Sequence, residues 1–465
     1  MGNKFKDLVK DTFIFAIGNI GSKIILFFLV PLYTAYMTQA QYGTSDLIFT
    51  IAQLILPFVT IVIHDALIRF GLSKDEKPED VLLASYTVLT IGTIVTIIIT
   101  PLFGLYRPIA MWKWQLSSYI ILSAFNSSNM NYLKVKGKNV CYTVIGLVHT
   151  ALMAALNIIL LVVYRLGIEG YLLASIGSMF ASVVLSTVFG KIPTDLKKAK
   201  FRKDLMMRMA KYSAPLILNN ISWWVVHSSD KVMVEMMMDA KALGLYTVSA
   251  KIPALINVMI NIFSQAWGIS SVREFENSND TKFYSAVLEV YSFICFGASI
   301  IFIAVTKPFM HLYVSENFFD SWRYVPTLLT AAAFASIAYY YGSLYGALKK
   351  SGRNMATTLL AAVVNILVNY VGIKAVGIYG AAIGTLVAYI VMASVRMIDV
   401  GRFIKIQIRW GRFLTVCALS LIQTLFVTLD LNGYIVSIGI FIVFIILYHD
   451  IIAEMMKKAK KKIRR

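Results

Sequence analysis

The sequence predicts an all-α polytopic membrane protein of about 14 transmembrane helices, arranged as two pseudo-symmetric six-helix bundles plus two additional C-terminal helices. Three observations predict this class. The 465-residue chain is 58% hydrophobic and only 15% charged, whereas soluble domains are about one quarter charged. Apolar stretches of about 18 or more residues recur along its length. The two halves of the chain also resemble each other.

The apolar stretches give the helices in order, and each is long enough to cross a hydrocarbon core about 30 Å thick. The fourteen stretches are 11–37, 44–68, 81–105, 116–133, 140–164, 169–190, 209–236, 243–270, 283–306, 324–347, 355–376, 378–398, 412–429 and 432–452. No segment of soluble-domain size remains between them. The first stretch follows basic residues, as in a signal peptide, but it is long and polar residues interrupt it. We therefore expect a retained helix.

The net charge of +20 is a topology signal. With a cytoplasmic N-terminus, 34 of the 44 lysines and arginines fall in inner segments, among them Arg396 and the 191–211 loop, and 7 fall in outer segments. The positive-inside rule gives this asymmetry for an even number of helices, so both termini are expected in the cytoplasm. The inner charges favour contact with anionic membrane lipid, and no nucleic-acid partner is needed to explain them.

The chain contains one unit twice, in helices 1–6 and helices 7–12. The matching segments are 37–43 with 238–244, 133–139 with 348–354, and 167–170 with 377–380. Six helices per copy place the pseudo-twofold axis along the membrane normal, and such transporters bind substrate between the halves near the midplane. Glycines that begin the third pair of segments are expected at tight turns.

The repeat predicts three regions. Residues 1–204 form the N-terminal six-helix bundle with its basic inter-bundle loop, and residues 205–404 form the second bundle. Residues 405–465 form helices 13 and 14 and a basic cytoplasmic tail.

Three lysines, Lys23, Lys231 and Lys251, interrupt apolar stretches. A cation at the centre of a membrane helix costs about 2.5–3.5 kcal/mol on insertion scales, so such residues usually face a polar cavity. We therefore predict a cationic cavity between the bundles and an anionic ligand.

Polar side chains accompany these lysines at helical spacing. The expected cavity-lining residues besides the three lysines are Asn19, Asn220, Trp224, His227, Asn257 and Asn261. The asparagines could instead bond between helices and hold a bundle together. The tryptophan could stack on a sugar ring or simply pack.

Acidic residues offer sites for ion coupling or gating. Asp65, with His64, lies near the inner end of helix 2 and could couple transport to an ion gradient, or pair with Arg69 one turn away. Asp230 could be the counter-ion of its neighbour Lys231 or a gating residue.

Several absences disfavour an enzyme. The three cysteines are dispersed and form no metal-binding or disulfide pattern. There is no phosphate-binding loop and no HExxH motif, so we expect no catalytic residues, no metal and no cofactor. The predicted outer loops are too short for a catalytic domain.

Two segments resemble bacterial oligosaccharide flippases of the polysaccharide biosynthesis family, namely 29–43 (beginning Leu-Val-Pro-Leu-Tyr) and 230–246 (beginning Asp-Lys and ending Ala-Leu-Gly-Leu-Tyr). The family belongs to a superfamily that also contains multidrug extruders and the peptidoglycan precursor flippase. The resemblance runs over essentially the whole chain. Relatives often carry arginine at cavity positions where this chain has lysine, which lacks a bidentate fork.

The resemblance implies a flippase of the bacterial cytoplasmic (inner) membrane. Its cargo would be undecaprenyl-diphosphate-linked oligosaccharide repeat units, translocated from the inner to the outer leaflet by alternating access. The pathway would be biosynthesis of a polysaccharide such as O-antigen, capsule or exopolysaccharide, with a glycan polymerase and glycosyltransferases as partners. The residues agree independently on one point, because a diphosphate needs fixed cations once it leaves water.

Other functions remain open at this stage. A drug or organic-cation antiporter of the same superfamily would favour acidic residues in the cavity. A peptidoglycan lipid-precursor flippase would take a similar anionic cargo. A membrane glycan polymerase or ligase would need a reactive cluster at the outer surface, and a scaffold for glycan assembly would leave the three lysines without a role.

Overall fold

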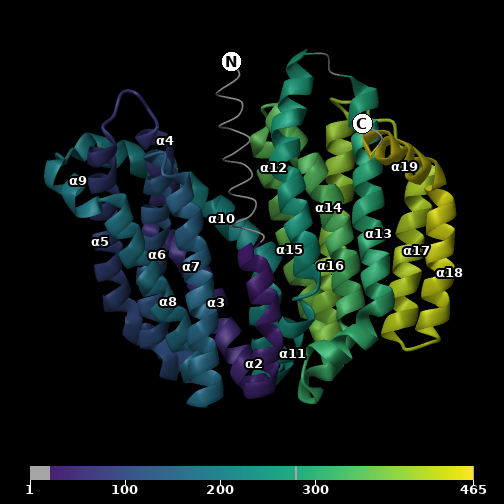
Figure 1. The fold of residues 1–465 in the computed structure, drawn as a ribbon, viewed down its shortest axis with the longest axis horizontal. Helices are drawn as coiled ribbons and strands as arrows, with labels where there is room; N and C mark the ends of the chain where they lie inside the picture. The colour runs from purple at the N-terminus through teal and green to yellow at the C-terminus, as the bar shows by residue number, and fades with distance from the viewer. Residues whose placement is uncertain (1–20, 278–279, 464–465) are drawn as a thin grey trace. The chain divides into compact units, whose positions relative to one another are not determined.

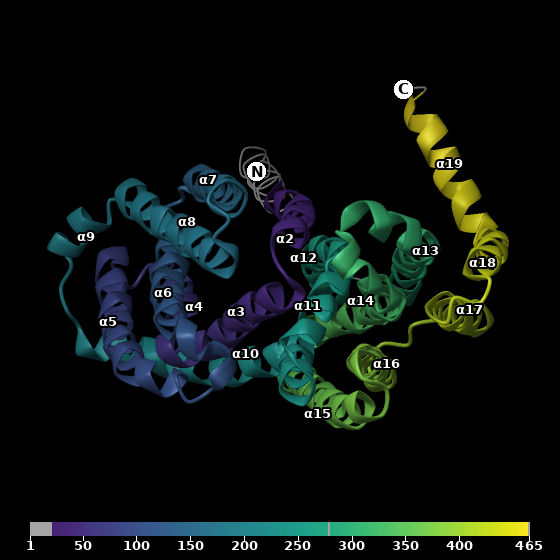
Figure 2. The same ribbon diagram turned by 90° about the horizontal axis from the view of Figure 1, so that it is seen from below.

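The computed structural model describes residues 21–277 and 280–463, and in these ranges the secondary structure is helical. The chain forms two compact units (Figures 1 and 2). The first comprises Met1–Trp224 with Asp239–Gly244, and the second comprises Val225–Met238 with Leu245–Arg465. The predicted fold class is confirmed, while the predicted boundaries at 204 and 404 stay predictions.

Between Val30 and Lys203, the first unit contains ten helical elements that precede α10. They are α2 (Val30–Tyr36), α3 (Gln39–Thr60), α4 (Ile63–Gly71), α5 (Pro78–Phe103), η1 (Arg107–Trp112), α6 (Lys113–Val135), α7 (Asn139–Asn157) with the π-helical continuation η2 (Ile158–Val163), α8 (Gly167–Gly190) and α9 (Ile192–Lys198). One hydrophobic core of this unit consists of buried side chains from α4, α5, α6, α9 and the start of α10.

Helix α10 (Lys203–Met237) runs from the first unit into the second. The elements that follow are α11 (Ala240–Ser249), α12 (Pro253–Asn277), α13 (Thr281–Tyr313), η3 (Glu316–Arg323), α14 (Val325–Ala347), α15 (Ser351–Val376), α16 (Ile378–Gly401), α17 (Trp410–Thr428), α18 (Gly433–Leu447) and α19 (His449–Ile463). Helix α14 is buried on nearly every face, packed by α12, α13, α16 and α17.

Nine helices in the described ranges are long and apolar enough to cross a membrane, and Gly21–Tyr36 and Gly433–Leu447 are shorter apolar helices. The predicted spans at 116–133, 209–236 and 324–347 are also helical, in α6, α10 and α14. These three carry more polar residues, as expected of helices that contact other helices on most sides. The chain is therefore a multi-pass membrane protein.

Two predicted helices are each broken into two. The stretch 44–68 was expected to be one helix, but Ile61 and Val62 adopt left-handed backbone angles, with φ of 49° and 52°, and separate α3 from α4. The stretch 243–270 is broken before Pro253, whose ring disfavours helix at the residue that precedes it. Hydropathy alone cannot detect either break, because the residues at both remain largely apolar.

The duplicated segments adopt matching local structures. Thr38 Oγ1 accepts a hydrogen bond from Gln41 N at 3.2 Å and caps α3. At the equivalent position of the second copy, Asp239 Oδ1 accepts from Ala242 N at 2.7 Å and caps α11. Both are hydrogen bonds from the third helical residue to the N-cap, so the repeat found in the sequence extends to capping geometry.

The glycines at the start of α8 and α16 also correspond. Gly167 and Gly377 have φ of +54° and +61°, the left-handed region that glycine tolerates best, which confirms the predicted turns. Three residues after Gly377, α15 and α16 approach closely. A Cβ atom on Gly380 would lie 1.9 Å from the carbonyl carbon of Gly372.

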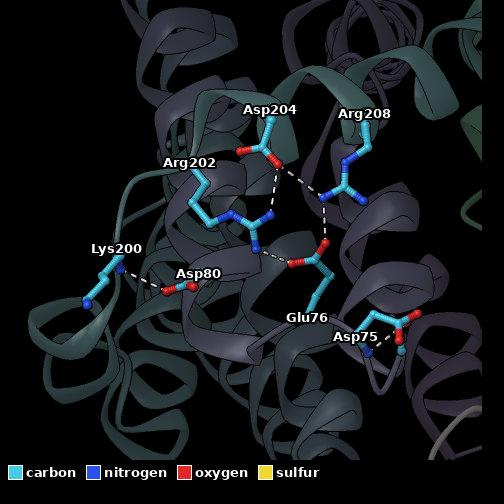
Figure 3. A network of polar contacts seen from close by, with 8 residues as sticks. Asp75, Glu76, Asp80, Lys200, Arg202, Asp204 and Arg208 are labelled. Carbon is cyan, nitrogen blue, oxygen red and sulfur yellow. Dashed lines mark hydrogen bonds and ion pairs between the residues drawn. The ribbon is translucent and has the colours of Figure 1, made fainter.

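An ionic network fixes the inter-bundle loop to the first unit (Figure 3). The Glu76 carboxylate, only 5% exposed, accepts hydrogen bonds from Arg202 Nη1 at 2.6 Å and Arg208 Nη2 at 2.5 Å. Asp204 bonds the same two arginines from the solvent side. Two acids and two arginines thus join the α4–α5 loop to the start of α10.

A second contact holds α9 in place. Asp195 accepts hydrogen bonds from Tyr132 OH at 2.9 Å and from Lys136 Nζ. Burial alone would raise the pKa of Asp195, but these two donors hold the pKa below its ordinary value. The basic 191–211 segment is therefore ordered against the first unit.

Replacing Gly380 with alanine should destabilise the second unit, because the new methyl group would overlap α15. We expect a loss of about 1–3 kcal/mol, the usual cost of overpacking, measured by thermal unfolding of the detergent-purified protein. Gly352→Ala is the matched control, since nothing lies within 4 Å of its Cβ position. Equal unfolding temperatures for the two variants would contradict the close approach.

Replacing Glu76 with glutamine should cost about 1–2 kcal/mol, because it removes the buried negative charge shared by two arginines that are themselves partly exposed. Asp204→Asn is the control; this carboxylate is 60% exposed, so its loss should cost less than about 1 kcal/mol. The measurement is again thermal unfolding. An equal or larger effect of Asp204→Asn would show that the buried acid is not the anchor.

Candidate functional site

Four of the residues that the sequence analysis selected meet at one cavity in the second unit. His227, Asp230, Lys231 and Asn257 line a cavity of about 90 Å³ together with residues of α11, α14 and α16. Helical spacing explains the first three, which lie on α10, and Asn257 lies one turn into α12. A cation, an anion, an imidazole and an amide therefore share one small cavity.

Asp230 is buried and both of its oxygens are occupied. Its Oδ1 accepts from the Lys231 backbone N–H at 2.8 Å. Its Oδ2 accepts from the Tyr246 hydroxyl and from Thr385 Oγ1, the latter at 3.1 Å. These three donors from α10, α11 and α16 stabilise a charge that hydrocarbon could not solvate.

His227 is held by two tyrosines. Its Nε2 lies 3.0 Å from Tyr339 OH, and its Nδ1 lies 3.0 Å from Tyr389 OH. A neutral imidazole can donate at one nitrogen and accept at the other, so the pair of hydroxyls fixes the plane of the ring. The ring thereby links α10 to both α14 and α16.

Lys231 is half-buried and lines the cavity beside Asp230. Lys251 was predicted within a helix but lies in the break between α11 and α12, between the lining residues Ala250 and Pro253. Lysine at a helix break is easier to accommodate than lysine inside a helix, because the backbone there is itself polar. Asn261 lies one turn beyond Asn257 on α12 and is exposed.

The remaining candidates belong to the first unit. Lys23 lies on the apolar helix Gly21–Tyr36, and its side chain is exposed. Asn220 Nδ2 donates to Leu216 O of its own helix at 2.9 Å. Trp224 Nε1 donates to Thr50 O of α3 at 2.9 Å, which is a packing contact. Asn19 lies outside the described residues.

His64 and Asp65 begin α4, directly after the left-handed break. His64 Nε2 lies 3.9 Å from Asp65 Oδ1, and the Asp65 side chain is 47% exposed. The predicted pair of Asp65 with Arg69 is wrong for the described structure, since Arg69 lies over the ring of Tyr212, 5.5 Å from its centroid. Asp65 and Arg69 both lie within the continuous helix α4, so their spacing alone does not make the pair.

The sequence analysis missed a second polar cluster next to the cavity. Asn365 Oδ1, on α15, accepts from Ser229 Oγ of α10 at 2.9 Å and from Asn369 Nδ2 at 3.0 Å. Both asparagines are fully buried. Their spacing of four residues within an apolar stretch is the signal that could have found them, as it did for Asn257 and Asn261.

Arg396 was counted with an inner segment although the predicted span 378–398 contains it, and the structure places it within α16. It is 1% exposed within α16, where Nη1 donates to Ala338 O at 2.8 Å and Nε donates to Thr357 Oγ1 at 3.0 Å. No carboxylate pairs with it among the residues that the structure describes. Gly342 leaves room for the guanidinium, since its Cβ position would lie 2.6 Å from Nη1. Arg396 is therefore a buried cation that joins α16 to α14 and α15.

Comparison with known proteins identifies the family of the chain and structures that share its fold. The family model described as polysaccharide biosynthesis protein matches residues 8–267, more than half of the chain. "Lsg locus putative protein 1" of Haemophilus influenzae is 22% identical over 263 residues, which cover 55% of this chain and 64% of that protein. The match thus spans less than two thirds of that relative.

Solved structures share the fold. The lipid II flippase MurJ in an inward closed conformation superposes with a TM-score of 0.70 at 14% identity, over 95% of this chain and 100% of that chain. A multidrug resistance MATE family transporter in an inward-facing conformation has a TM-score of 0.65 at 15% identity, over 82% and 98%. At these identities the similarity concerns the fold.

Replacing Asp230 with alanine should destabilise the second unit by about 2–4 kcal/mol, because Tyr246 and Thr385 would lose their buried acceptor. Asp230→Asn keeps one acceptor oxygen and should cost clearly less. Thermal unfolding of both purified variants measures the difference. Two equally stable variants would mean that Asp230 is not held as described.

Proposed function

Because the chain belongs to the polysaccharide biosynthesis protein family, we propose that it is a flippase for undecaprenyl-diphosphate-linked oligosaccharide repeat units. It moves these units from the inner to the outer leaflet of the bacterial cytoplasmic membrane by alternating access, with both termini in the cytoplasm. The exported units serve biosynthesis of O-antigen, capsule or exopolysaccharide. A glycan polymerase and glycosyltransferases are the expected partners.

Lys231 carries the proposal. It places an ammonium group on α10, beside a cavity that is also lined by a hydrogen-bonding histidine and an asparagine. A phosphate leaving water needs such a fixed cation, and amide and imidazole groups can bond sugar hydroxyls. A cavity of about 90 Å³ admits one phosphate-sized group and excludes an oligosaccharide, so it can contact only part of the cargo at a time. Lys23 and Lys251 are the further cations that we assign to the path.

The proposed translocation needs no catalysis. Translocation of a lipid-linked head group breaks no covalent bond, so the proposal assigns no catalytic residue, metal or cofactor. The lipid tail stays in the bilayer while the charged head group crosses a polar path, which avoids exposing a diphosphate to hydrocarbon.

Asp230 supports a role in coupling transport to an ion gradient, and it also favours a second candidate function, that of an organic-cation antiporter. A buried carboxylate that bonds three donors can change its contacts when it gains a proton or binds a cation, and His64 with Asp65 is the corresponding candidate in the first unit. The same carboxylate in the cavity is what an organic-cation antiporter would need. Drug susceptibility of a deletion strain separates this alternative, and a growth requirement would indicate the peptidoglycan-precursor function.

Lys231→Ala should reduce surface polysaccharide at least about tenfold while leaving the protein in the membrane, because one alanine removes the cation nearest the cavity. Lys23→Ala and Lys251→Ala should act in the same direction, and Lys231→Arg should retain more export because it keeps the charge. The measurements are surface polysaccharide by immunoblot and transporter abundance in isolated membranes.

Lys349→Ala is the matched control, since it removes an exposed lysine that does not line the cavity. It should export normally. Normal export by the Lys23, Lys231 and Lys251 alanine variants would exclude the anion path. Formation of new glycosidic bonds by the purified protein would instead indicate a polymerase or ligase.

A further inference from the structure

A second cavity lies in the second unit, where the C-terminal helical pair joins the rest. It has a volume of about 440 Å³ between the start of α13, residues 407–409, the start of α17 and the end of α18. Its polar wall contains Lys282, Arg409 and Arg412 with one carboxylate, Glu289, and its apolar wall includes Phe413. A cavity with one cationic side and one apolar side suits an amphiphilic anion.

An ionic network builds the cationic wall. Arg412 bonds Glu289 Oε1 at 2.5 Å and Asp450 Oδ2 at 3.0 Å. Arg409 Nη1 lies 3.2 Å and 2.9 Å from the same two carboxylate oxygens. The segment before α17 is also tied to α13, because Gln407 N donates to Ser285 Oγ at 2.9 Å.

This wall keeps capacity for a further anion. The contacts of Arg409 use Nη1, and among the described residues its Nη2 and Nε have no other acceptor, so they remain able to donate. Lys282 adds a third positive charge to the two carboxylates and two guanidinium groups. These five groups together carry one net positive charge. The two parallel N–H donors of a guanidinium group match the two oxygens of a phosphodiester.

The position of the cavity points to the membrane as the source of its ligand. Helices α17 and α18 are apolar along their length, and Tyr448, which lines the cavity, follows the last residue of α18. Figure 2 shows α17 and α18 nearly end-on and α19 side-on, so α19 runs across the direction of the spanning helices. Its sequence carries five lysines after Met456, which is the composition of a helix at an anionic membrane surface.

We propose that this cavity binds an anionic phospholipid of the leaflet on the inner, lysine-rich side. The phosphodiester contacts Lys282, Arg409 and Arg412, and the start of an acyl chain lies along Phe413. The lipid therefore contacts both the appended helices and α13 of the six-helix bundle. This site is distinct from the cavity at Lys231, so the proposal does not depend on the cargo.

Native mass spectrometry of the full-length protein tests this directly, after incubation with equal amounts of phosphatidylglycerol and phosphatidylcholine of identical acyl chains. We expect phosphatidylglycerol adducts about tenfold more abundant than phosphatidylcholine adducts. The double variant Lys282→Gln with Arg409→Gln should lower this preference below about twofold, and Lys282→Arg with Arg409→Lys should keep it.

Lys197→Gln with Lys198→Gln, two exposed lysines of α9, is the matched control and should bind like the native protein. Equal loss in this control, or no loss in the cavity variant, overturns the proposal. Displacement of the lipid by excess glycerol phosphate would assign the cavity to a soluble phosphate instead. Should the cavity variant misfold in gel filtration, benzoylphenylalanine at Phe413 decides: crosslinking to phosphatidylglycerol supports the site, and none overturns it.

Discussion

The constraint on which this structure depends is the absence of water in the hydrocarbon core. Each polar group within the spanning helices must find its partner inside the protein. Arg396 of α16 shows this clearly, because its buried guanidinium donates to acceptors on two other helices, α14 and α15. Asp230 shows the anionic case, with donors from α10, α11 and α16. The helices of the second unit are thus joined by their few polar residues as well as by apolar packing.

The same constraint places the residues proposed for function among those that stabilise the fold. Hydrogen bonds from Lys231 N, Tyr246 and Thr385 hold the Asp230 carboxyl group at the cavity that Lys231 also lines, so stability and ligand chemistry use one set of residues. A cavity that contains both signs of charge can hold an anion on the lysine while the acid responds to protons or cations. The network of Arg412, Glu289 and Asp450 likewise combines a structural and a binding role. It anchors α19 and forms one wall of the proposed lipid cavity.

Duplication explains why parts of the architecture could be predicted well. Turns and caps are local, so Gly167 and Gly377, or Thr38 and Asp239, keep their geometry wherever the surrounding chain differs. The fold class and most helix ranges were predicted from composition and apolar spacing, and the family from the resemblance of two segments. The breaks at Ile61 and at Lys251 were not predicted, because hydropathy registers neither a left-handed backbone at Ile61 nor the effect of Pro253 on the residues before it.

The sequence by itself determined the membrane class, the helix order, the repeat and the presence of cations in apolar stretches, since these follow from composition and spacing. Only the tertiary structure decided which polar residues meet. It brought His227, Asp230, Lys231 and Asn257 to one cavity, and it buried Arg396, which the sequence analysis had counted with an inner segment. The physical reason is that a side chain's partner within a bundle lies on another helix, and the rotation of each helix is set by packing against all its neighbours.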